Sequence, residues 1–321
     1  MQFLYEVVTN ENIILTVILA TLIIRLATVF GDIKSRQSSL RMAAVQPQLD
    51  KLRKKYEKDQ NRLAIEQRKF MKENNVSMFG GCLPMLITLP LFFIFIAAFR
   101  QWGQEMNVRL ILALEENESA GLAMFEKFRF LWINNVWVAD NGLKPVVETV
   151  TDFLGKVNAK LPNLLYFQDH PEALEKFVDL GFFVRTTITD GTSVSYTYAL
   201  AEITPELTER YNALVAPCIE LYTKNGVVYN NGWFVMPVLA GATTFLSSWI
   251  MTRKQPQNEA AGSTNKIFQW MMPLMTVWFC LSNNACFAVY WTFSNICSLI
   301  TSLIINAAFE KKSKSLEEAK S

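Results

Sequence analysis

The chain has 321 residues, enough for one large domain or two modest ones, and its net charge of +2 gives no field that would favour nucleic acid. Its five cysteines include no Cys-x-x-Cys pair and its only histidine is His170, which argues against a disulfide framework, a zinc site and a His-based catalytic triad. Hydrophobic residues make up 51% of the chain and charged residues 19%. The hydrophobic residues gather in long uncharged runs with the charges between them, a distribution typical of an all-α polytopic membrane protein.

The first apolar run, Ile13–Phe30, is interrupted only by Arg25 and predicts a membrane span over residues 12–30. Residues 1–11 contain two glutamates and no Lys or Arg, so we expect them on the outer side of the membrane. No Arg-rich, acid-poor transit sequence precedes the run, and no Ala-x-Ala-like cleavage site follows it. We therefore interpret the run as an uncleaved span, with a processed signal sequence as the alternative.

Residues 31–77 contain twelve basic and six acidic residues, and this excess predicts a cytoplasmic location. Apolar residues at helical spacing predict two charged helices that join near Lys58–Asn61 as a cytoplasmic helical hairpin. Pro47 is interpreted either as a kink or as the first turn of a new helix. The pattern leaves open whether the hairpin only connects two spans or is a mobile arm that meets incoming chains, lipid headgroups or a partner complex. Its candidate functional residues are Pro47, Tyr56 and Asp59.

A second span is predicted at residues 78–99, and the acid-rich region at residues 100–231 is expected on the outer side. Within that region, residues 143–230 form an insert that we expect to be a small, mostly α-helical cap with limited strand content. An amphipathic stretch at Glu172–Leu180 and a possible hairpin at Asn225–Gly226 support this expectation.

The remaining apolar residues predict three more spans. Ile267–Phe309 is uncharged but too long for one crossing of a hydrocarbon core about 30 Å thick, which needs about 20 residues, so we place a turn at Ser282–Asn284. Basic residues predominate in the flanking loop and tail, which predicts that both are cytoplasmic. The resulting elements are span 3 at residues 232–251, a cytoplasmic loop at residues 252–265, span 4 at residues 266–282, span 5 at residues 285–309 and a cytoplasmic tail at residues 310–321.

Arg25 is the most informative residue in these spans, because a guanidinium in hydrocarbon costs roughly 3 kcal/mol on insertion scales. It could snorkel to the cytoplasmic interface, but Thr21 and Thr28 share its helix face and favour a hydrated surface. Polar residues also recur at helical spacing on the third and fifth spans; they are Thr243, Thr244, Ser247, Ser248, Trp291, Ser294, Asn295, Ser298, Thr301, Ser302 and Asn306.

Helix–helix packing explains each of these hydroxyl groups taken alone. Polar faces on three spans together predict instead a shared hydrated cavity with one fixed positive charge. No Asp or Glu lies in any predicted span, which excludes a carboxylate proton relay, an aspartyl protease and a carboxylate-bound cation site.

Short motifs recur in order along the spans. They are Gly81–Pro90 in the second span, Phe130–Ile133 on the outer side, Gly232–Pro237 at the start of the third span, Met272–Met275 in the fourth, and Tyr290–Trp291 followed by Ser294–Asn295 in the fifth, together with Gln46–Pro47 in the hairpin and Arg25. In order, spacing and predicted topology, residues 12–142 and 231–310 resemble the YidC/Oxa membrane protein insertases. The short connection between the first two spans resembles the Gram-positive bacterial type.

This resemblance implies five transmembrane helices around a hydrophilic groove that is open to the cytoplasm and to lipid and closed on the outside, in the bacterial plasma membrane. It implies no cofactor or nucleotide, and as partners nascent membrane proteins, membrane lipids, the Sec translocon and the ribosome. Thr88 stands where the family often has Gln, Asn284–Cys286 replaces the usual Pro-Ala-Gly, and the tail is short and modestly basic. The residues expected to contact a client in the groove are Arg25, Thr21, Thr28, Thr88, Trp291, Asn295, Ser298 and Ser302.

The resulting hypothesis is a membrane protein insertase and chaperone that carries out no bond chemistry and is not an enzyme. A structural or assembly subunit with the same fold is the alternative, and Thr88 is the one feature that favours it. A small-solute transporter would require inverted repeats with Gly- or Pro-broken helices in two halves, which the sequence does not show.

Overall fold

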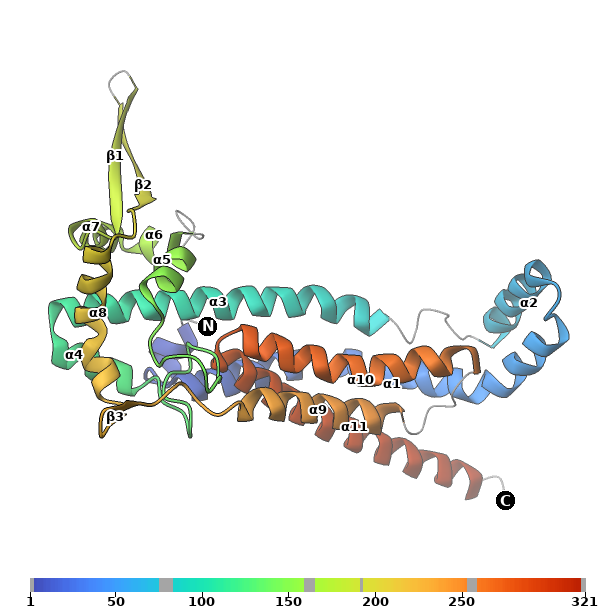
Figure 1. Ribbon diagram of the computed structural model, residues 1–321. Helices are drawn as coiled ribbons and strands as arrows, with labels where there is room; N and C mark the ends of the chain where they lie inside the picture. The colour runs from blue at the N-terminus through green and yellow to red at the C-terminus, as the bar shows by residue number, and fades with distance from the viewer. Residues whose placement is uncertain (1–2, 75–82, 159–164, 191–192, 253–258, 319–321) are drawn as a thin grey trace.

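The computed structural model of the protein describes residues 3–74, 83–158, 165–190, 193–252 and 259–318. Within these residues, five helices of 18 or more residues lie side by side (Figure 1). The predicted hairpin and the C-terminal part of the chain lie at one end of this bundle, and the predicted insert and the N-terminal part lie at the other. The long helices are α1 (Ile13–Lys55), α3 (Leu83–Glu116), α9 (Val235–Thr252), α10 (Glu259–Ser282) and α11 (Ala285–Glu318).

Helix α1 follows a short π-helix, η1 (Leu4–Val8), and begins with a capped first turn. The Asn12 side chain accepts a hydrogen bond of 2.9 Å from the backbone N–H of Leu15 and so satisfies one of the free donors at the helix start. The helix then continues through Pro47 to Lys55, so of the two interpretations of Pro47 the start of a new helix is wrong. A proline removes one intrahelical hydrogen bond, and the residues that follow it, mostly Leu, Lys, Arg and Gln, are strong helix formers that continue the helix.

The turn of the hairpin lies where the sequence predicts it. Tyr56 is the C-cap residue of α1. The Asp59 carboxylate accepts a 3.0 Å hydrogen bond from the backbone N–H of Arg62 at the start of α2 (Gln60–Glu73). Such N-terminal capping by Asp stabilises a helix by about 1 kcal/mol.

Helix α3 ends at Glu116, well beyond the predicted end of the second span at residue 99. Residues 78–82 of that predicted span lie outside the described residues. The helix continues because Trp102, Met106 and Leu110 recur every four residues and are all buried. Asn117 then caps the following helix, α4 (Glu118–Glu126).

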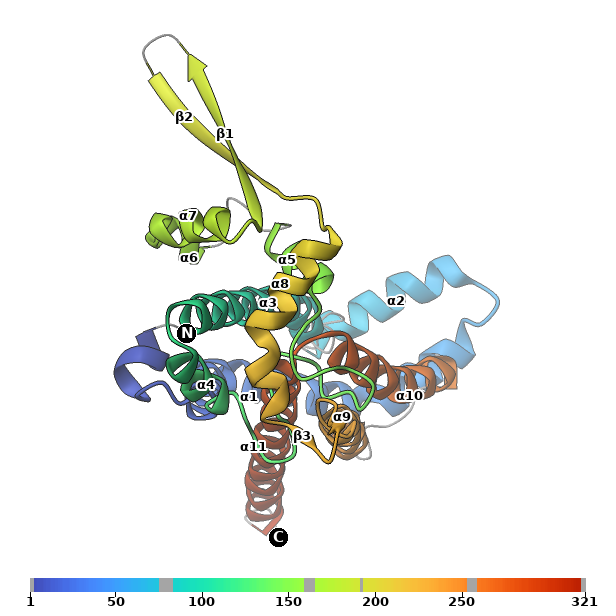
Figure 2. The ribbon, with the colours of Figure 1, turned by 60° about the vertical axis from the view of Figure 1, so that its left-hand side comes forward.

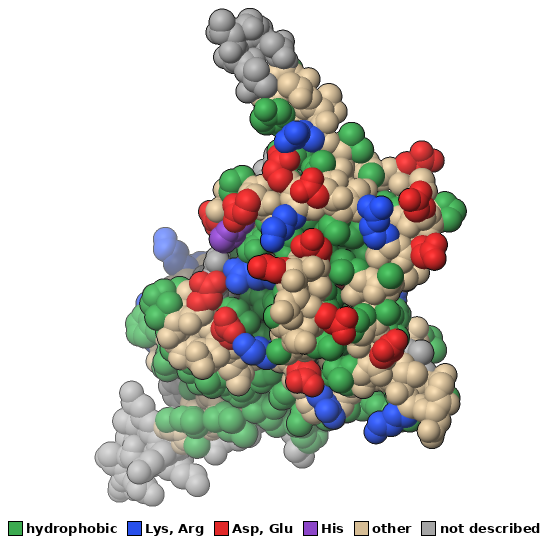
Figure 3. All heavy atoms as spheres, turned by 90° about the vertical axis from the view of Figure 1, so that its left-hand side faces the viewer, with side chains coloured by type: hydrophobic (Ala, Val, Ile, Leu, Met, Phe, Trp, Pro, Cys, Tyr) green, Lys and Arg blue, Asp and Glu red, His purple; other side chains and the backbone are tan. Residues whose placement is uncertain are grey.

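The insert is mostly helical, as predicted, and contains α5 (Val150–Asn158), α6 (Leu165–Asp169), α7 (Pro171–Asp179) and α8 (Pro205–Glu220). Helix α7 coincides with the predicted amphipathic stretch and buries Ala173, Leu174 and Phe177. These residues belong to an aromatic core in which Phe153 contacts both Phe177 and Tyr211. Figure 3 shows the outer surface of this end, on which acidic and basic side chains are interspersed.

An antiparallel ribbon of β1 (Phe183–Asp190) and β2 (Ser193–Leu200) projects from the insert (Figure 2). The sequence analysis does not predict this ribbon, although an Asp-Gly dipeptide between two Thr- and Tyr-rich runs is a hairpin signal. The second hairpin is confirmed: β3 (Thr223–Lys224) pairs with β4 (Val227–Val228). Between them, Asn225 and Gly226 have φ values of 52° and 75°, as a two-residue turn of the I′ type requires.

The C-terminal helices are joined at the predicted turn. Helix α10 ends at Ser282 and α11 begins at Ala285, so the division of the long apolar stretch is confirmed. Helix α10 begins at Glu259, before the predicted span, and α11 continues into the predicted tail as far as Glu318. Helices α9 and α10 approach closely at Gly241, where an added Cβ would lie 2.5 Å from Cγ2 of Val277.

Two helical segments in the described residues are long and apolar enough to cross a membrane, Ile13–Lys34 and Ala285–Ala308. The apolar segment Val235–Ile250 of α9 is shorter. The fold is therefore mostly helical with two segments that satisfy this criterion, and the remaining three predicted spans stay predictions.

Candidate functional site: a polar cluster and its outer cap

Polar side chains connect α11 to α1 on one side and to α9 on the other, and together we call them the polar cluster: Arg25, Thr243, Thr244, Trp291, Ser294 and Asn295. Its charged member, Arg25, is half-buried and reaches α11. Its Nε and Nη2 atoms donate to the Ser294 hydroxyl at 3.1 and 2.5 Å. A guanidinium has five N–H donors, and the described residues supply no other hydrogen-bond acceptor to this one. Arg25 is therefore only partly satisfied.

The charge on Arg25 is also without an ion pair in the described part of the chain, where every salt bridge involves other cations. Asp32, seven residues further along α1, interacts with Arg25 electrostatically but is not within ion-pair distance. A cation held against neutral partners in a largely apolar setting attracts carboxylates strongly, since water and counter-charges screen it less.

The two threonines expected beside Arg25 have different surroundings. Thr21 is buried, and its hydroxyl donates to the Val17 carbonyl at 2.7 Å within the same helix. Thr28 is half-buried and donates to the Arg25 carbonyl at 3.3 Å. Neither hydroxyl contacts the guanidinium, so the structure brings these residues together on one helix without making them partners of the charge.

The polar residues of α11 face two different helices. The indole Nε1 of Trp291 donates to the Thr244 hydroxyl at 3.1 Å, and Asn295 Nδ2 donates to the same oxygen at 2.8 Å. Ser294 lies about 100° around the helix from Asn295 and faces Arg25 instead. Trp291 and Asn295 therefore connect α11 to α9, and the helix-packing interpretation accounts for both of them.

The other predicted site residues occupy separate positions. Ser298 and Ser302 are half-buried and follow Asn295 on the same face of α11. Thr88 lies in α3, but its side chain is outside the described residues. Tyr56 and Asp59 lie at the turn of the hairpin, where Tyr56 stacks against Lys55 and Arg62, and Pro47 is exposed on α1. The hairpin residues are thus distant in the fold from the polar cluster (Figure 1).

A second group of polar residues closes the opposite end of the bundle, and sequence reasoning missed it. Asp140 is fully buried, and its carboxylate accepts hydrogen bonds from the backbone N–H groups of Trp233, Phe234 and Met236 at 2.6 to 3.0 Å. It also accepts one from the indole of Trp132 at 3.1 Å. The Asp140 carboxylate thereby accepts from free donors at and just before the start of α9, where a negative charge complements the helix dipole.

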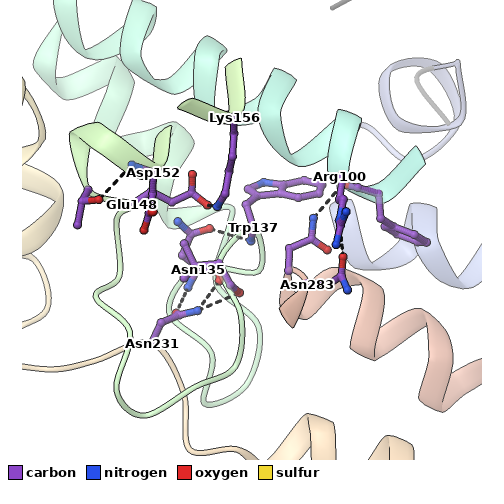
Figure 4. A network of polar contacts seen from close by, with 12 residues as sticks. Arg100, Asn135, Trp137, Glu148, Asp152, Lys156, Asn231 and Asn283 are labelled. Carbon is purple, nitrogen blue, oxygen red and sulfur yellow. Dashed lines mark hydrogen bonds and ion pairs between the residues drawn. The ribbon is translucent and has the colours of Figure 1, made fainter. Parts of the chain in front are cut away.

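Figure 4 shows how asparagines extend this closure. Asn231 donates to the carbonyls of Asn135, Val138 and Ala139 and accepts from the backbone of Asn135. Asn135 in turn donates to the carbonyl of Val146 at 2.8 Å. We call these loops, residues 130–148 and 230–236, the outer cap.

Next to the outer cap, the turn before α11 is bonded both to α3 and to the cap. Arg100 Nε of α3 donates to the Asn283 side chain at 2.7 Å, and Asn284 donates to the Phe99 carbonyl at 2.8 Å (Figure 4). The backbone N–H groups of Ala285 and Cys286 donate to the carbonyls of Val138 and Val136. One end of the bundle is therefore joined by hydrogen bonds from four separate parts of the chain.

A charged pair lies beside the cap in the insert. Lys156 donates to the Glu148 carboxylate, and burial raises the pKa of Glu148 while the Lys156 ammonium lowers it. The Glu148 carbonyl also accepts from the Tyr211 hydroxyl at 2.9 Å. This pair connects α5 to the cap, and the Tyr211 bond connects α8. We do not interpret it as a reactive centre, because the carboxylate and the ammonium already form an ion pair with each other.

The sequence of the chain was compared with known proteins. The profile of the family described as 60Kd inner membrane protein matches residues 3–186 and 196–313. A protein of Clostridium perfringens named "Membrane protein insertase YidC" is 30% identical over 145 residues, which are 45% of this chain and 52% of that protein. A protein of the same name from Clostridium tetani is 40% identical over 92 residues, which are 28% of this chain and 42% of that protein. Another from Treponema denticola is 28% identical over 183 residues, which are 57% of this chain and 31% of that protein.

The chain thus spans about half the length of the curated relatives that it matches, or less. The family profile, in contrast, covers most of the chain, including α1, α3, α9, α10 and nearly all of α11, and so includes both the polar cluster and the outer cap. The resemblance drawn from the short motifs is confirmed, and the chain belongs to the 60Kd inner membrane protein family.

Proposed function

We propose that this protein inserts other proteins into a membrane, and that a client's polar segment enters a hydrophilic groove beside Arg25. The relatives with sequence similarity are named membrane protein insertases. The single observation that carries the proposal is the partly satisfied Arg25 guanidinium, which has a neutral hydroxyl partner and no ion pair in the described residues. An acidic residue of a client would supply the missing counter-charge.

The mechanism needs no energy source beyond the hydrophobic effect. A polar segment that waits in the groove crosses less hydrocarbon, because part of the bilayer is replaced by polar side chains and water. The client's apolar segment then moves into lipid alongside α9 and α11, where its burial contributes about 0.8 kcal/mol per CH₂ group. Bond chemistry plays no part in this process.

The outer cap supports a groove that is closed on one side. Its hydrogen bonds join the starts of α9 and α11 at the insert end of the bundle, and Asn284, just before α11, donates to the Phe99 carbonyl of α3. The hairpin lies at the other end, where basic residues predominate and where we place the cytoplasm (Figure 1). We infer a protein of the bacterial plasma membrane that crosses it five times, with its N-terminus outside and its C-terminus inside.

The proposed partners are nascent membrane proteins and membrane lipids, with the Sec translocon and the ribosome as further candidates. The hairpin would meet incoming chains or a partner complex, since most of the basic side chains in residues 31–77 are exposed. Cysteine labelling tests the orientation. A cysteine at Lys58 should be protected from an impermeant reagent added outside, and one at Asp152 in α5 should react.

Photocrosslinking tests the activity directly. A photoreactive residue at Ser298 should crosslink to a nascent single-span client with an acidic leading segment. The matched control is Ile300 on the same helix, which is 51% exposed and which we place toward lipid. Crosslinks from Ser298 to lipid alone, with none to the client, would contradict the proposal.

A structural or assembly subunit is the second candidate, and one observation favours it. Trp291 and Asn295 are satisfied by the threonines of α9, as helix packing requires, and are not free to bind a client. Complementation of an insertase-depleted bacterium separates the two functions, because a scaffold without insertion activity would not restore growth.

A further inference from the structure

A pocket of about 800 Å³ lies beside the outer cap and takes no part in the proposed insertion path. We call it the outer pocket. It is formed where the end of α4, the β3–β4 hairpin and the start of α9 meet, and its lining includes Arg129, Trp132, Tyr222, Lys224, Tyr229 and Trp233. It combines two cations with five large aromatic side chains, one of them Phe234, and none of its lining residues is acidic.

The two cations of this pocket lack the ion pairs that most other cations of the outer region make, a property they share with Arg100, Lys144 and Arg210 among the described residues. Arg109, Lys127, Lys156 and Arg185 each have a carboxylate within 4 Å. Arg129 and Lys224 have none among the described residues, although both are exposed on the same acid-rich side of the molecule. Glu126 interacts electrostatically with Tyr222 but does not line the pocket. The pocket is therefore a locally positive site suited to an anion.

The backbone at this pocket is strained. Leu131 and Phe234, both lining residues, have φ values of 53° and 64°, in the left-handed region that residues other than glycine rarely adopt. The hydrogen bonds of Asp140 to Trp132 and to Trp233 and Phe234 hold the two strained segments in place. Residues kept in such conformations by their surroundings occur preferentially at ligand sites.

The lipid-facing surface of α9 continues directly from the pocket. Trp233 is 70% exposed, and the apolar residues that follow it, Val235, Val238, Leu239 and Leu246, are exposed along the helix. An exposed Trp at the end of an apolar helix is typical of the membrane interface, where the headgroups lie. A ligand with an anionic head and long acyl chains matches both parts of this surface, and a small soluble anion matches only the first.

We propose that the outer pocket binds the phosphate of an anionic phospholipid, with Arg129 and Lys224 as its charged contacts and the acyl chains lying along α9. The proposal depends on the membrane location of the family and not on the insertion activity. A bound lipid would connect β3–β4 and the end of α4 to the start of α9, and so stabilise the arrangement of the outer cap.

Lipid binding by the full-length protein in detergent, measured by native mass spectrometry, tests this proposal. The probes are dioleoyl phosphatidylglycerol and dioleoyl phosphatidylcholine. We expect tighter binding of the anionic lipid and a loss of about fivefold in its affinity for each of Arg129→Gln and Lys224→Gln, because each cation near a membrane surface contributes about that factor. Phosphatidylcholine binding should change little.

Lys144→Gln is the matched control, since this exposed lysine also lies on the outer side but does not line the pocket. Thermal unfolding of each variant establishes that it is folded. Glycerol 1-phosphate is the competing probe for a soluble anion, and it should not displace the lipid at equal concentration. Equal displacement would overturn the lipid assignment. Equal binding of both lipids to the wild type, or an unchanged preference in the double variant, would overturn the site.

Discussion

The outer cap and the polar cluster place buried charges in opposite situations. The Asp140 carboxylate accepts four hydrogen bonds, three of them from the backbone at the start of α9. The Arg25 guanidinium directs two of its five donors at a single hydroxyl oxygen. A saturated buried charge holds structure together, whereas an unsaturated one retains capacity to bind a ligand. The comparison therefore assigns stability to the cap and client attraction to the cluster.

The largest expected effect is the loss of stability in Asp140→Ala. The substitution removes the acceptor of three backbone N–H groups and one indole N–H, of which the Met236 N–H is buried, and we expect a loss of about 3 kcal/mol in the free energy of unfolding. Gly232→Ala should act on the same contact, because Gly232 has a φ of 82° and an added Cβ would lie 2.0 Å from the Asp140 carboxylate.

Thermal or denaturant unfolding in detergent measures both effects. Asp152→Asn, at an exposed position in α5, is the control and should change stability by less than about 0.5 kcal/mol. If Asp140→Ala unfolded like the control, the carboxylate would not hold the cap, and the division between the two regions would be lost.

Arg25→Ala should have the next largest effect, on activity rather than stability. Insertion of clients with one or two acidic residues before their span should fall about tenfold or more, which corresponds to the loss of about 1.4 kcal/mol of attraction. The variant should stay folded and be as stable as the wild type, because a costly buried charge is removed. Arg25→Lys should keep much of the activity, since an ammonium still attracts carboxylates.

Insertion into inverted membrane vesicles, compared for clients with and without acidic leading residues, measures this effect. Clients without acidic residues are the internal control and should be inserted almost normally. A loss of the same size for both kinds of client, or wild-type insertion of the acidic ones by Arg25→Ala, would make Arg25 an anchor at the membrane interface and leave the groove to its hydroxyl groups.

The features that the sequence predicts correctly are those set by nearby residues. The Asn225–Gly226 turn, the hairpin turn near Lys58–Asn61 and the break at Ser282–Asn284 follow from local backbone preferences and hydrogen bonds. The family resemblance likewise rests on short motifs in order, and the family profile confirms it. The sequence left open whether α1 continues past Pro47, and it does so because neighbouring helix formers outweigh the loss of one hydrogen bond.

The partners of the buried charges could not be predicted, because they come from residues far apart in the chain. Ser294 lies 269 positions from Arg25, and although it belongs to the polar residues predicted on the fifth span, nothing in the sequence pairs it with Arg25. The backbone N–H groups that donate to Asp140 lie 93 to 96 positions from it. Such pairs depend on how the helices pack, and helical spacing alone specifies only which residues share a face.

Glu148 gives a smaller effect that depends on pH and sharpens the contrast with Asp140. Burial raises its pKa in the folded protein, so the folded state binds a proton more readily than the unfolded state. Stability should therefore fall as the pH rises through the range above the ordinary glutamate pKa, and become constant once the pH exceeds the pKa of Glu148 in the folded protein.

Glu148→Gln should remove this slope, whereas Glu148→Asp should keep it. Unfolding temperatures between pH 4 and pH 8 provide the measurement, and an unchanged slope in Glu148→Gln would assign the pH dependence to other groups.

Ser294→Ala should have the smallest effect, and it separates the charge of Arg25 from its hydrogen bonds. The substitution removes the only acceptor that the described residues offer to this guanidinium, and the expected loss in the free energy of unfolding is about 1 kcal/mol, the usual net value of a hydrogen bond. If the charge attracts clients, a freed guanidinium should still do so, and insertion of acidic clients should stay within about twofold of the wild type.

Ser298→Ala, one turn further along α11, is the control for loss of a hydroxyl group at a comparable depth. A loss of insertion in Ser294→Ala as large as in Arg25→Ala, with Ser298→Ala unaffected, would mean that the position imposed by the hydrogen bonds matters more than the charge. The polar cluster would then resemble the outer cap, with its charged group acting through fixed geometry.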